Sequence, residues 1–185
     1  MLLSLAVVVC LSAKPPPDAR LDLLEAMVAE VDRSHQSLTL KENPAPYFVG
    51  AQVKDYLHHE IGAKYGALFA DAQEHERKLF ADVRVGSYEF DSSVGEELDF
   101  SFSLKGTSFF APKQGPLDDS PTALRTALWL VIDEKYKSAL FNYLKKKGED
   151  VYTVDVPGRA PSFTKQEREM FVGPRAPYAF SRDRW

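Results

Sequence analysis

Two stretches of the chain place apolar residues at helical spacing. The first covers residues 18–33, and Asp18 is a residue typical of a helix start. Its apolar face consists of Leu21, Leu24, Met27, Val28 and Val31. The second stretch covers residues 121–147, with Ser120 at the N-cap position and Pro121 at the first helical position. Its apolar stripe consists of Leu124, Leu128, Val131, Ile132, Ala139, Leu140 and Tyr143. We expect Gly148 to end this helix, after a lysine run at residues 145–147 that suits the negative helix end.

Between these two predicted helices, apolar residues recur at every second position. The alternating runs cover residues 37–40, 47–54, 61–69, 79–86 and 98–105. Each run is typical of a strand with one face on a core and the other near water. Short connections favour antiparallel pairing over crossovers. The pattern predicts an α+β fold, an antiparallel meander sheet of four to five strands with two helices packed on one face.

The two ends of the chain differ from this central domain, which we place at residues 14–148. Residues 2–11 are apolar apart from Ser4, and Ser12 and Ala13 follow them. This pattern favours a signal peptide over residues 1–13 and a mature chain that begins near Lys14, periplasmic or secreted. The alternatives are a buried N-terminal strand and a lipoprotein anchored through Cys10. Residues 149–185 lose all periodicity and combine prolines with aromatic residues. We interpret them as an extended arm that packs on its own domain or on a partner.

Composition narrows the class of protein. The chain has 185 residues, of which 44% are hydrophobic. This hydrophobic content is sufficient for a core and argues against global disorder. The net charge of -4 disfavours nucleic acid as a partner. Cys10 is the single cysteine, so one chain has neither a disulfide framework nor a multi-thiolate zinc site. No further apolar run approaches the length of a membrane span, so we expect no membrane span in the mature chain.

The histidines are the first candidates for metal chemistry. His58 and His59 precede Glu60, and His75 precedes Glu76. In the predicted meander these groups lie at turns on opposite ends of a strand of about ten residues, roughly 30 Å apart. Neighbouring residues of a strand also face opposite sides, so His58 and His59 should not chelate together. We therefore predict polar surface histidines and no metal site.

Other polar groups also favour structural roles. The glycines at positions 62 and 66 lie inside a predicted strand, where glycine allows close packing or a bulge rather than phosphate binding. The acidic pairs at 118–119 and 96–97 are typical of turns and helix starts. Arg84 is expected to be a polar anchor on the second face of the sheet, paired with Asp82 or Asp91. No catalytic, cofactor-binding or metal-ligating residue is predicted.

An ordered series of fragments resembles a known family. The fragments are Met27, Arg33-Ser34, Pro46-Tyr47-Phe48-Val49, Ala63-Lys64-Tyr65-Gly66-Ala67-Leu68, Val83-Arg84-Val85-Gly86-Ser87-Tyr88, Asp91, Pro116-Leu117-Asp118-Asp119, Ala123-Leu124-Arg125-Thr126-Ala127-Leu128-Trp129-Leu130, Asp133-Glu134-Lys135-Tyr136-Lys137 and Ala139-Leu140. Their order and spacing resemble the N-terminal part of TldD/PmbA-type zinc metallopeptidases, also called modulators of DNA gyrase. The resemblance covers residues 20–148 and extends toward residue 170.

The resemblance implies a non-catalytic domain. The family carries its zinc ligands in a His-Glu-x-x-x-His helix with a further cysteine, downstream of the matching region. Here His59-Glu60 is followed by Ala63 where the second histidine would stand. The resemblance implies an α+β domain that acts in assembly or substrate access, with a separate catalytic chain or as a homodimer, or that remains from a truncated peptidase. The alternative is a stand-alone periplasmic module that binds a small ligand or peptide between the sheet and the long helix.

Overall fold

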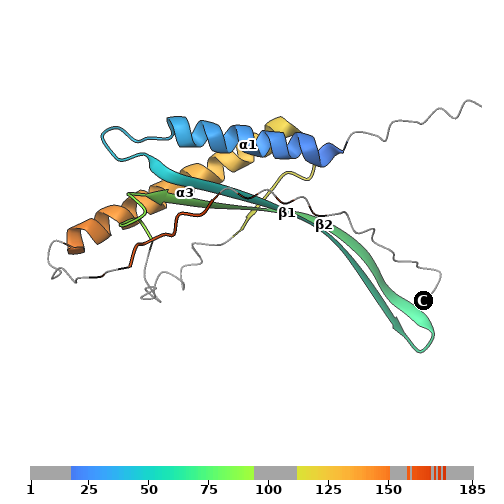
Figure 1. Cartoon of the computed structure of the whole chain (residues 1–185). Coiled ribbons are helices and arrows are strands. Elements are labelled where there is room, and N and C mark those ends of the chain that lie inside the picture. Colours follow the sequence, from blue (N-terminus) through green and yellow to red (C-terminus); the bar gives the residue numbers. More distant parts are fainter. Residues whose placement is uncertain are drawn as a thin grey trace, which may run out of the picture.

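The computed structural model describes residues 18–93, 112–150, 158, 160–167, 169, 171 and 173. In chain order the elements are helix α1 (Ala19–Ser37), strands β1 (Pro46–Lys64), β2 (Ala67–Val85) and β3 (Lys113–Gln114), and helix α3 (Pro121–Asp150). The strands form one antiparallel sheet in the order β1-β2-β3. Figure 1 shows a long curved hairpin of β1 and β2 that runs past the two helices and out into solvent. The fold is therefore α+β, as predicted.

The hairpin replaces three of the predicted strands. β1 and β2 each have 19 residues and pair along almost their whole length, from Pro46 opposite Val85 to Lys64 opposite Ala67. The prediction of turns around residues 58–60 and 75 was wrong, because these residues lie in the middle of β1 and β2. The predicted strand 61–69 was also wrong, because the chain reverses at Tyr65 and Gly66.

The core lies between the base of the hairpin and the helices. Alternate residues of β2, Leu79, Val83 and Val85, are fully buried, as are Leu124 and Leu128 of α3. The core cluster consists of Ala26, Val49, Leu79, Val83, Val85, Leu124, Leu128, Val131, Ile132, Tyr136, Ala139 and Leu140. Burial of one such large apolar side chain stabilises the folded protein by roughly 1.5–3 kcal/mol relative to leaving that side chain exposed. The period-two positions at the base of β2 thus meet the apolar stripe predicted for α3 in one core. The apolar face predicted for α1 is only partly correct: Met27 and Val31 pack against the core, but Leu21, Leu24 and Val28 are exposed.

The helix ends confirm two of the predicted caps. The Asp18 carboxylate accepts a hydrogen bond from the backbone N–H of Arg20, and the Ser120 hydroxyl accepts one from that of Ala123. Two boundaries differ from the prediction. α1 continues to Ser37, and Leu38–Leu40 is not a strand but a loop whose Leu40 N–H donates to the Tyr136 hydroxyl. α3 continues through Gly148 to Asp150. No atom lies within 4 Å of a side chain placed at Gly148, so no packing forces the helix to stop there.

Several predictions concern residues outside the described ranges. The signal peptide over 1–13 and the strand over 98–105 lie outside them, as does most of the arm over 149–185. The three strands of the described residues are therefore fewer than the four to five predicted. No helix within the described ranges is long and apolar enough to cross a membrane.

Candidate functional site

The distal half of the hairpin is the most unusual surface of the described structure. Every residue from 55 to 76 is exposed or half-buried. In the rest of β2, by contrast, Arg77, Leu79, Val83 and Val85 are buried. From here on, 'the arm' means residues 55–76 of this hairpin, and residues 149–185 are called the C-terminal segment. The strands of the arm span roughly 30 Å at about 3.3 Å per residue. The arm extends beyond both helices (Figure 1).

The end of the arm is apolar. Tyr65 has a φ of 52° and Gly66 a φ of 80°, and two positive φ values are what a two-residue type I′ turn requires. The Tyr65 side chain is 95% exposed and that of Phe69 is 72% exposed. The other large apolar residues that are exposed on the arm are Leu57 and Leu68.

A β-bulge beside the turn directs Phe69. The register shifts between Gly62 and Ala63, which leaves Phe69 without an opposite residue on β1. A side-chain carbon at Gly62 would lie 2.6 Å from the Phe69 ring, so the glycine provides the space that the ring occupies. The prediction that glycine here permits close packing or a bulge is confirmed.

Arg77 joins the arm to the body of the protein. Its side chain is only 2% exposed, and its five N–H groups make five hydrogen bonds. Nε and Nη2 donate to Asp55 at 3.3 and 2.7 Å, and Nη2 also donates to Asp119 at 2.8 Å. Nη1 donates to the carbonyl oxygens of Pro116 and Asp118, each at 3.0 Å. Burial alone would raise the pKa of Asp55, but the hydrogen bonds from Arg77 and His75 outweigh it and lower that pKa.

The three histidines of the arm lie close together, contrary to the predicted separation of 30 Å. The hairpin register sets Leu57 opposite His75, so His58 and His75 are near neighbours across the strands. Each histidine faces a carboxylate. The Nε2 atom of His75 lies 2.5 Å from Asp55, and the Nε2 atom of His59 lies 2.8 Å from Asp71.

His58 lies on the other face of the ribbon. Its ring stacks on that of Tyr56, with 5.7 Å between centroids, and its Nε2 atom is 3.9 Å from Glu76. The expectation that His58 and His59 face opposite sides is confirmed. In the part of the chain that the structure describes, no three or more His, Cys, Asp or Glu side chains are grouped to hold a metal ion.

A second polar cluster lies at the base of the hairpin, around the buried Asp91. Arg84 donates to Asp82 at 3.1 Å and to Asp91 at 3.2 Å, as predicted for Arg84. Tyr47 donates to Asp91 at 2.8 Å, and the Ser93 N–H does so at the same distance. Burial favours the neutral carboxyl, but these hydrogen bonds prevail and lower the pKa of Asp91. Burial and the hydrogen bond to Asp91 together raise the pKa of Tyr47 far above its ordinary value.

The described part of the C-terminal segment covers this second face of the sheet. The Phe163 ring lies 4.0 Å from the Arg84 guanidinium and 5.2 Å from the Phe48 ring. The N–H groups of Ser162 and Phe163 donate to the carbonyl oxygens of Glu89 and Tyr88. Residues 162–163 therefore pack on their own domain, one of the two possibilities left open by the sequence. Lys146, from the predicted lysine run, donates to the carbonyl oxygens of Asp91 and Ser93.

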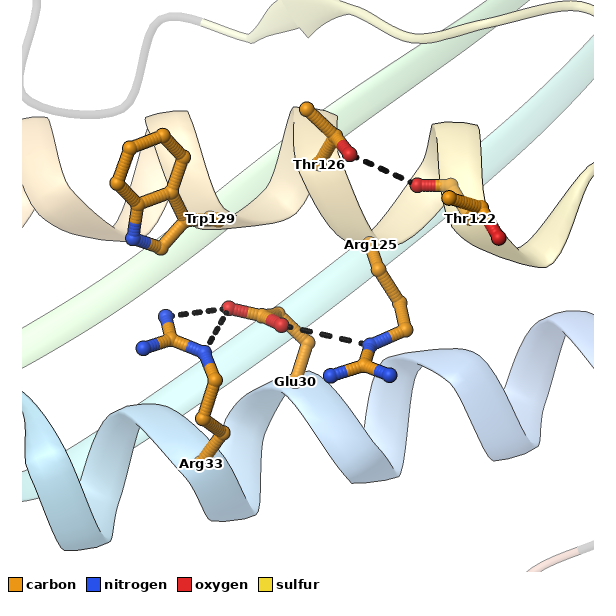
Figure 2. A pocket seen from close by; sticks show the side chains of 6 residues that line it. All are labelled: Glu30, Arg33, Thr122, Arg125, Thr126 and Trp129. Atoms are coloured by element: carbon orange, nitrogen blue, oxygen red, sulfur yellow. Dashed lines mark hydrogen bonds and ion pairs between the residues drawn. The ribbon is translucent and has the colours of Figure 1, made fainter.

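A pocket of about 360 Å³ lies between α1 and α3. Figure 2 shows the six residues that line it: Glu30, Arg33, Thr122, Arg125, Thr126 and Trp129. The Glu30 side chain is 3% exposed and accepts hydrogen bonds from Nε and Nη2 of Arg33, at 2.8 and 2.5 Å. Nε of Arg125 lies 3.5 Å from the other Glu30 oxygen. Two guanidinium groups thus share one carboxylate.

Sequence reasoning missed Arg77 and the pocket. A signal for the pocket exists in the sequence, because residues 122, 125, 126 and 129 have the spacing of one helix face. Arg77 gives no such signal, because all its partners are distant in the sequence: Asp55 precedes it by 22 residues, and the residues of the loop 116–119 follow it by about 40. Asp119 of the acidic pair 118–119 binds Arg77, whereas Cys10 and the pair 96–97 lie outside the described residues.

Comparison with known proteins gives no assignment, because no protein-family model, curated protein or solved structure matches the chain.

Proposed function

We propose that this chain is a non-catalytic assembly module whose arm docks on a separate catalytic chain. The proposal retains the resemblance to the N-terminal part of TldD/PmbA metallopeptidases and the absence of their His-Glu-x-x-x-His sequence. The catalytic partner would supply the zinc chemistry, and the arm would fix the partner's position or shape the path of its substrate. Export to the periplasm or beyond, and a four- to five-stranded sheet, are parts of the same proposal.

The observation that carries the proposal is the exposed arm. A two-stranded ribbon without other support is marginally stable in water, and a free apolar tip adds no core. Exposed apolar residues that lie close together mark interaction sites in soluble proteins. An aromatic pair such as Tyr65 and Phe69 is typical of the anchors that dominate binding energy at interfaces.

The conformation of Tyr65 supports a role beyond folding. A non-glycine residue at positive φ costs on the order of 1–2 kcal/mol, and the cost is smaller for asparagine, the common choice in this turn. Tyr65 is 95% exposed, and the Lys64 ammonium group lies 5.1 Å from the centroid of its ring, so contacts within the chain recover little of this cost. A partner that covers the ring would recover it.

The test is binding between this chain and a coexpressed chain that carries the His-Glu-x-x-x-His sequence. We expect the pair to elute together in size-exclusion chromatography. The double variant Tyr65→Asn, Phe69→Ser should elute separately with an unchanged circular dichroism spectrum. Leu130→Ser, at an exposed position on α3, is the matched control and should bind normally. Equal binding by all three forms would contradict the proposal.

A stand-alone binding module is the second candidate function. The pocket between α1 and α3 favours it, although the predicted location was between the sheet and the long helix. The two functions are compatible, because the pocket and the arm use different residues.

A further inference from the structure

We propose that the pocket between α1 and α3 binds a small monocarboxylate that carries a planar apolar group. The inference does not depend on docking of the arm, because no residue of the arm lines the pocket.

The lining comes from one face of each helix. Thr122, Arg125, Thr126 and Trp129 follow at intervals of three, one and three residues on α3, and Glu30 and Arg33 are three apart on α1. Residues at such spacing share a helix face. The pocket is the space between these two faces, each of which carries an arginine. Its volume of about 360 Å³ falls in the range of small-molecule sites, roughly 300–1,000 Å³.

The charges of the lining residues select a monoanion. Arg33 and Arg125 contribute two positive charges and Glu30 one negative charge, so the pocket retains one positive charge. Because the buried Glu30 carboxylate is fixed by Arg33, it stays in place when a ligand enters. A second negative charge on the ligand would meet Glu30 without a further cation to balance it. A carboxylate therefore fits better than a doubly charged phosphate.

Arg125 supplies the binding group. Its contact to Glu30 uses Nε at 3.5 Å, which is long for a charge-assisted hydrogen bond. Among the described residues, neither of its terminal nitrogens has a hydrogen bond to protein. The N–H groups of these two nitrogens can donate two parallel hydrogen bonds to one carboxylate. Figure 2 places the Arg125 guanidinium in the space between the two helices.

Trp129 supplies the apolar wall. Its side chain is 45% exposed and lies one helical turn beyond Arg125. An indole ring offers a flat surface on which a planar ligand stacks, and such contacts add to the energy of area burial. A ligand that spans Arg125 and Trp129 therefore needs a carboxylate at one end and a planar apolar group at the other.

Benzoate is the smallest probe with these two features. In the Trp185→Phe variant, Trp129 is the single tryptophan of the chain, so its indole N–H gives one signal in a ¹⁵N-correlated NMR spectrum. We expect benzoate to shift this signal saturably, and to bind at least about tenfold more tightly than benzyl alcohol, which lacks the charge. Phenyl phosphate, as a dianion, should bind more weakly than benzoate.

Variants of the pocket assign the interaction. Arg125→Gln should weaken benzoate binding at least about tenfold, and Arg125→Lys, which keeps the charge but not the two parallel N–H donors, should give an intermediate value. Lys137→Gln, on α3 but outside the pocket, and Tyr65→Asn, in the arm, should leave binding unchanged. Because Glu30 stays paired with Arg33, Arg125→Gln should keep the fold, which a thermal unfolding curve verifies.

Three results would overturn the inference. One is the absence of a saturable shift of the Trp129 signal with benzoate. The second is equal binding of benzyl alcohol, or tighter binding of phenyl phosphate. The third is unchanged benzoate binding in a folded Arg125→Gln variant.

Discussion

At the scale of single residues, Arg77 is the side chain whose hydrogen bonds connect the arm to the body of the protein. Arg77→Met should lower the free energy of unfolding by about 2–4 kcal/mol, because two carboxylates and two carbonyl oxygens lose their donors. Urea unfolding followed by circular dichroism measures this change. Arg77→Lys should recover only part of it, since an ammonium group has three donors instead of five.

Lys137→Met is the control for loss of a positive charge. Lys137 makes an exposed ion pair with Asp133 one turn away on α3, at 2.7 Å, and such pairs contribute less than about 0.5 kcal/mol. If Arg77→Met and Lys137→Met had similar effects, the buried network around Arg77 would have no special part in stability.

Asp91 makes the stability of the fold depend on pH. Its pKa is lowered in the folded protein relative to the ordinary 3.8, so its contribution is complete above about pH 4. The contribution is lost as the pH falls through the lower, folded-state pKa, because protonation weakens the bonds from Tyr47 and Arg84. Urea midpoints measured between pH 6 and pH 2 should therefore fall less for Asp91→Asn than for the natural chain. Asp55 titrates in the same direction, so some decline remains. Parallel profiles for the two proteins would show that Asp91 is not a source of the acid sensitivity.

The residue scale also shows what local sequence can and cannot predict. The pairing of Arg84 with Asp82 and Asp91 was predictable, since these residues are two and seven positions apart near one strand end. The burial of Arg77 was not, because a polar run of six residues from Gln73 to Lys78 gives no sign that one of them is enclosed. The loop that encloses Arg77 comes from residues 115–119, beyond a long intervening segment.

At the scale of elements, two glycines have opposite roles. Gly86 follows β2 with a φ of 113°, and a side-chain carbon there would lie 2.4 Å from the Phe90 carbonyl oxygen. Gly86→Ala should therefore cost roughly 2–4 kcal/mol through backbone strain and overlap. Gly148→Ala, in an open position of α3, should instead stabilise the protein by up to about 1 kcal/mol. Thermal unfolding of both variants tests the pair, and a destabilised Gly148→Ala would contradict the helical assignment of residue 148.

The elements also show where periodicity fails. Alternation of apolar and polar residues identified the base of each strand correctly, because one face of the base packs on α3. In the arm both faces meet solvent, so polar residues occupy both faces around residues 58–60 and 73–76, and the alternation that marks a strand disappears there. The charged groups around residues 58–60 and 75 therefore resembled turns. The alternation over residues 61–69 runs across the real turn instead. The actual turn, at Tyr65 and Gly66, lacks the Asn-Gly or Asp-Gly sequence that usually signals a hairpin.

At the scale of the whole molecule, the body and the arm have different roles. The body has a buried core and two polar clusters, around Arg77 and Asp91, that hold its loops in place. The arm adds no buried residue but extends an aromatic tip away from the body (Figure 1). We therefore expect the double variant Tyr65→Asn, Phe69→Ser to unfold at the same temperature as the natural chain or slightly above it, because the tip contributes to binding and not to the core.

The most direct test of the docking proposal is photo-crosslinking from the tip of the arm. The natural chain is produced in its own cells with benzoylphenylalanine in place of Tyr65, irradiated, and its adducts are identified by mass spectrometry. A second protein with the same amino acid at Leu130, an exposed position on α3, is the control. The account predicts one dominant adduct from position 65, with a chain that carries the His-Glu-x-x-x-His sequence, and no such adduct from position 130. Adducts from position 65 that lack any such chain, or that match those from position 130, would contradict it.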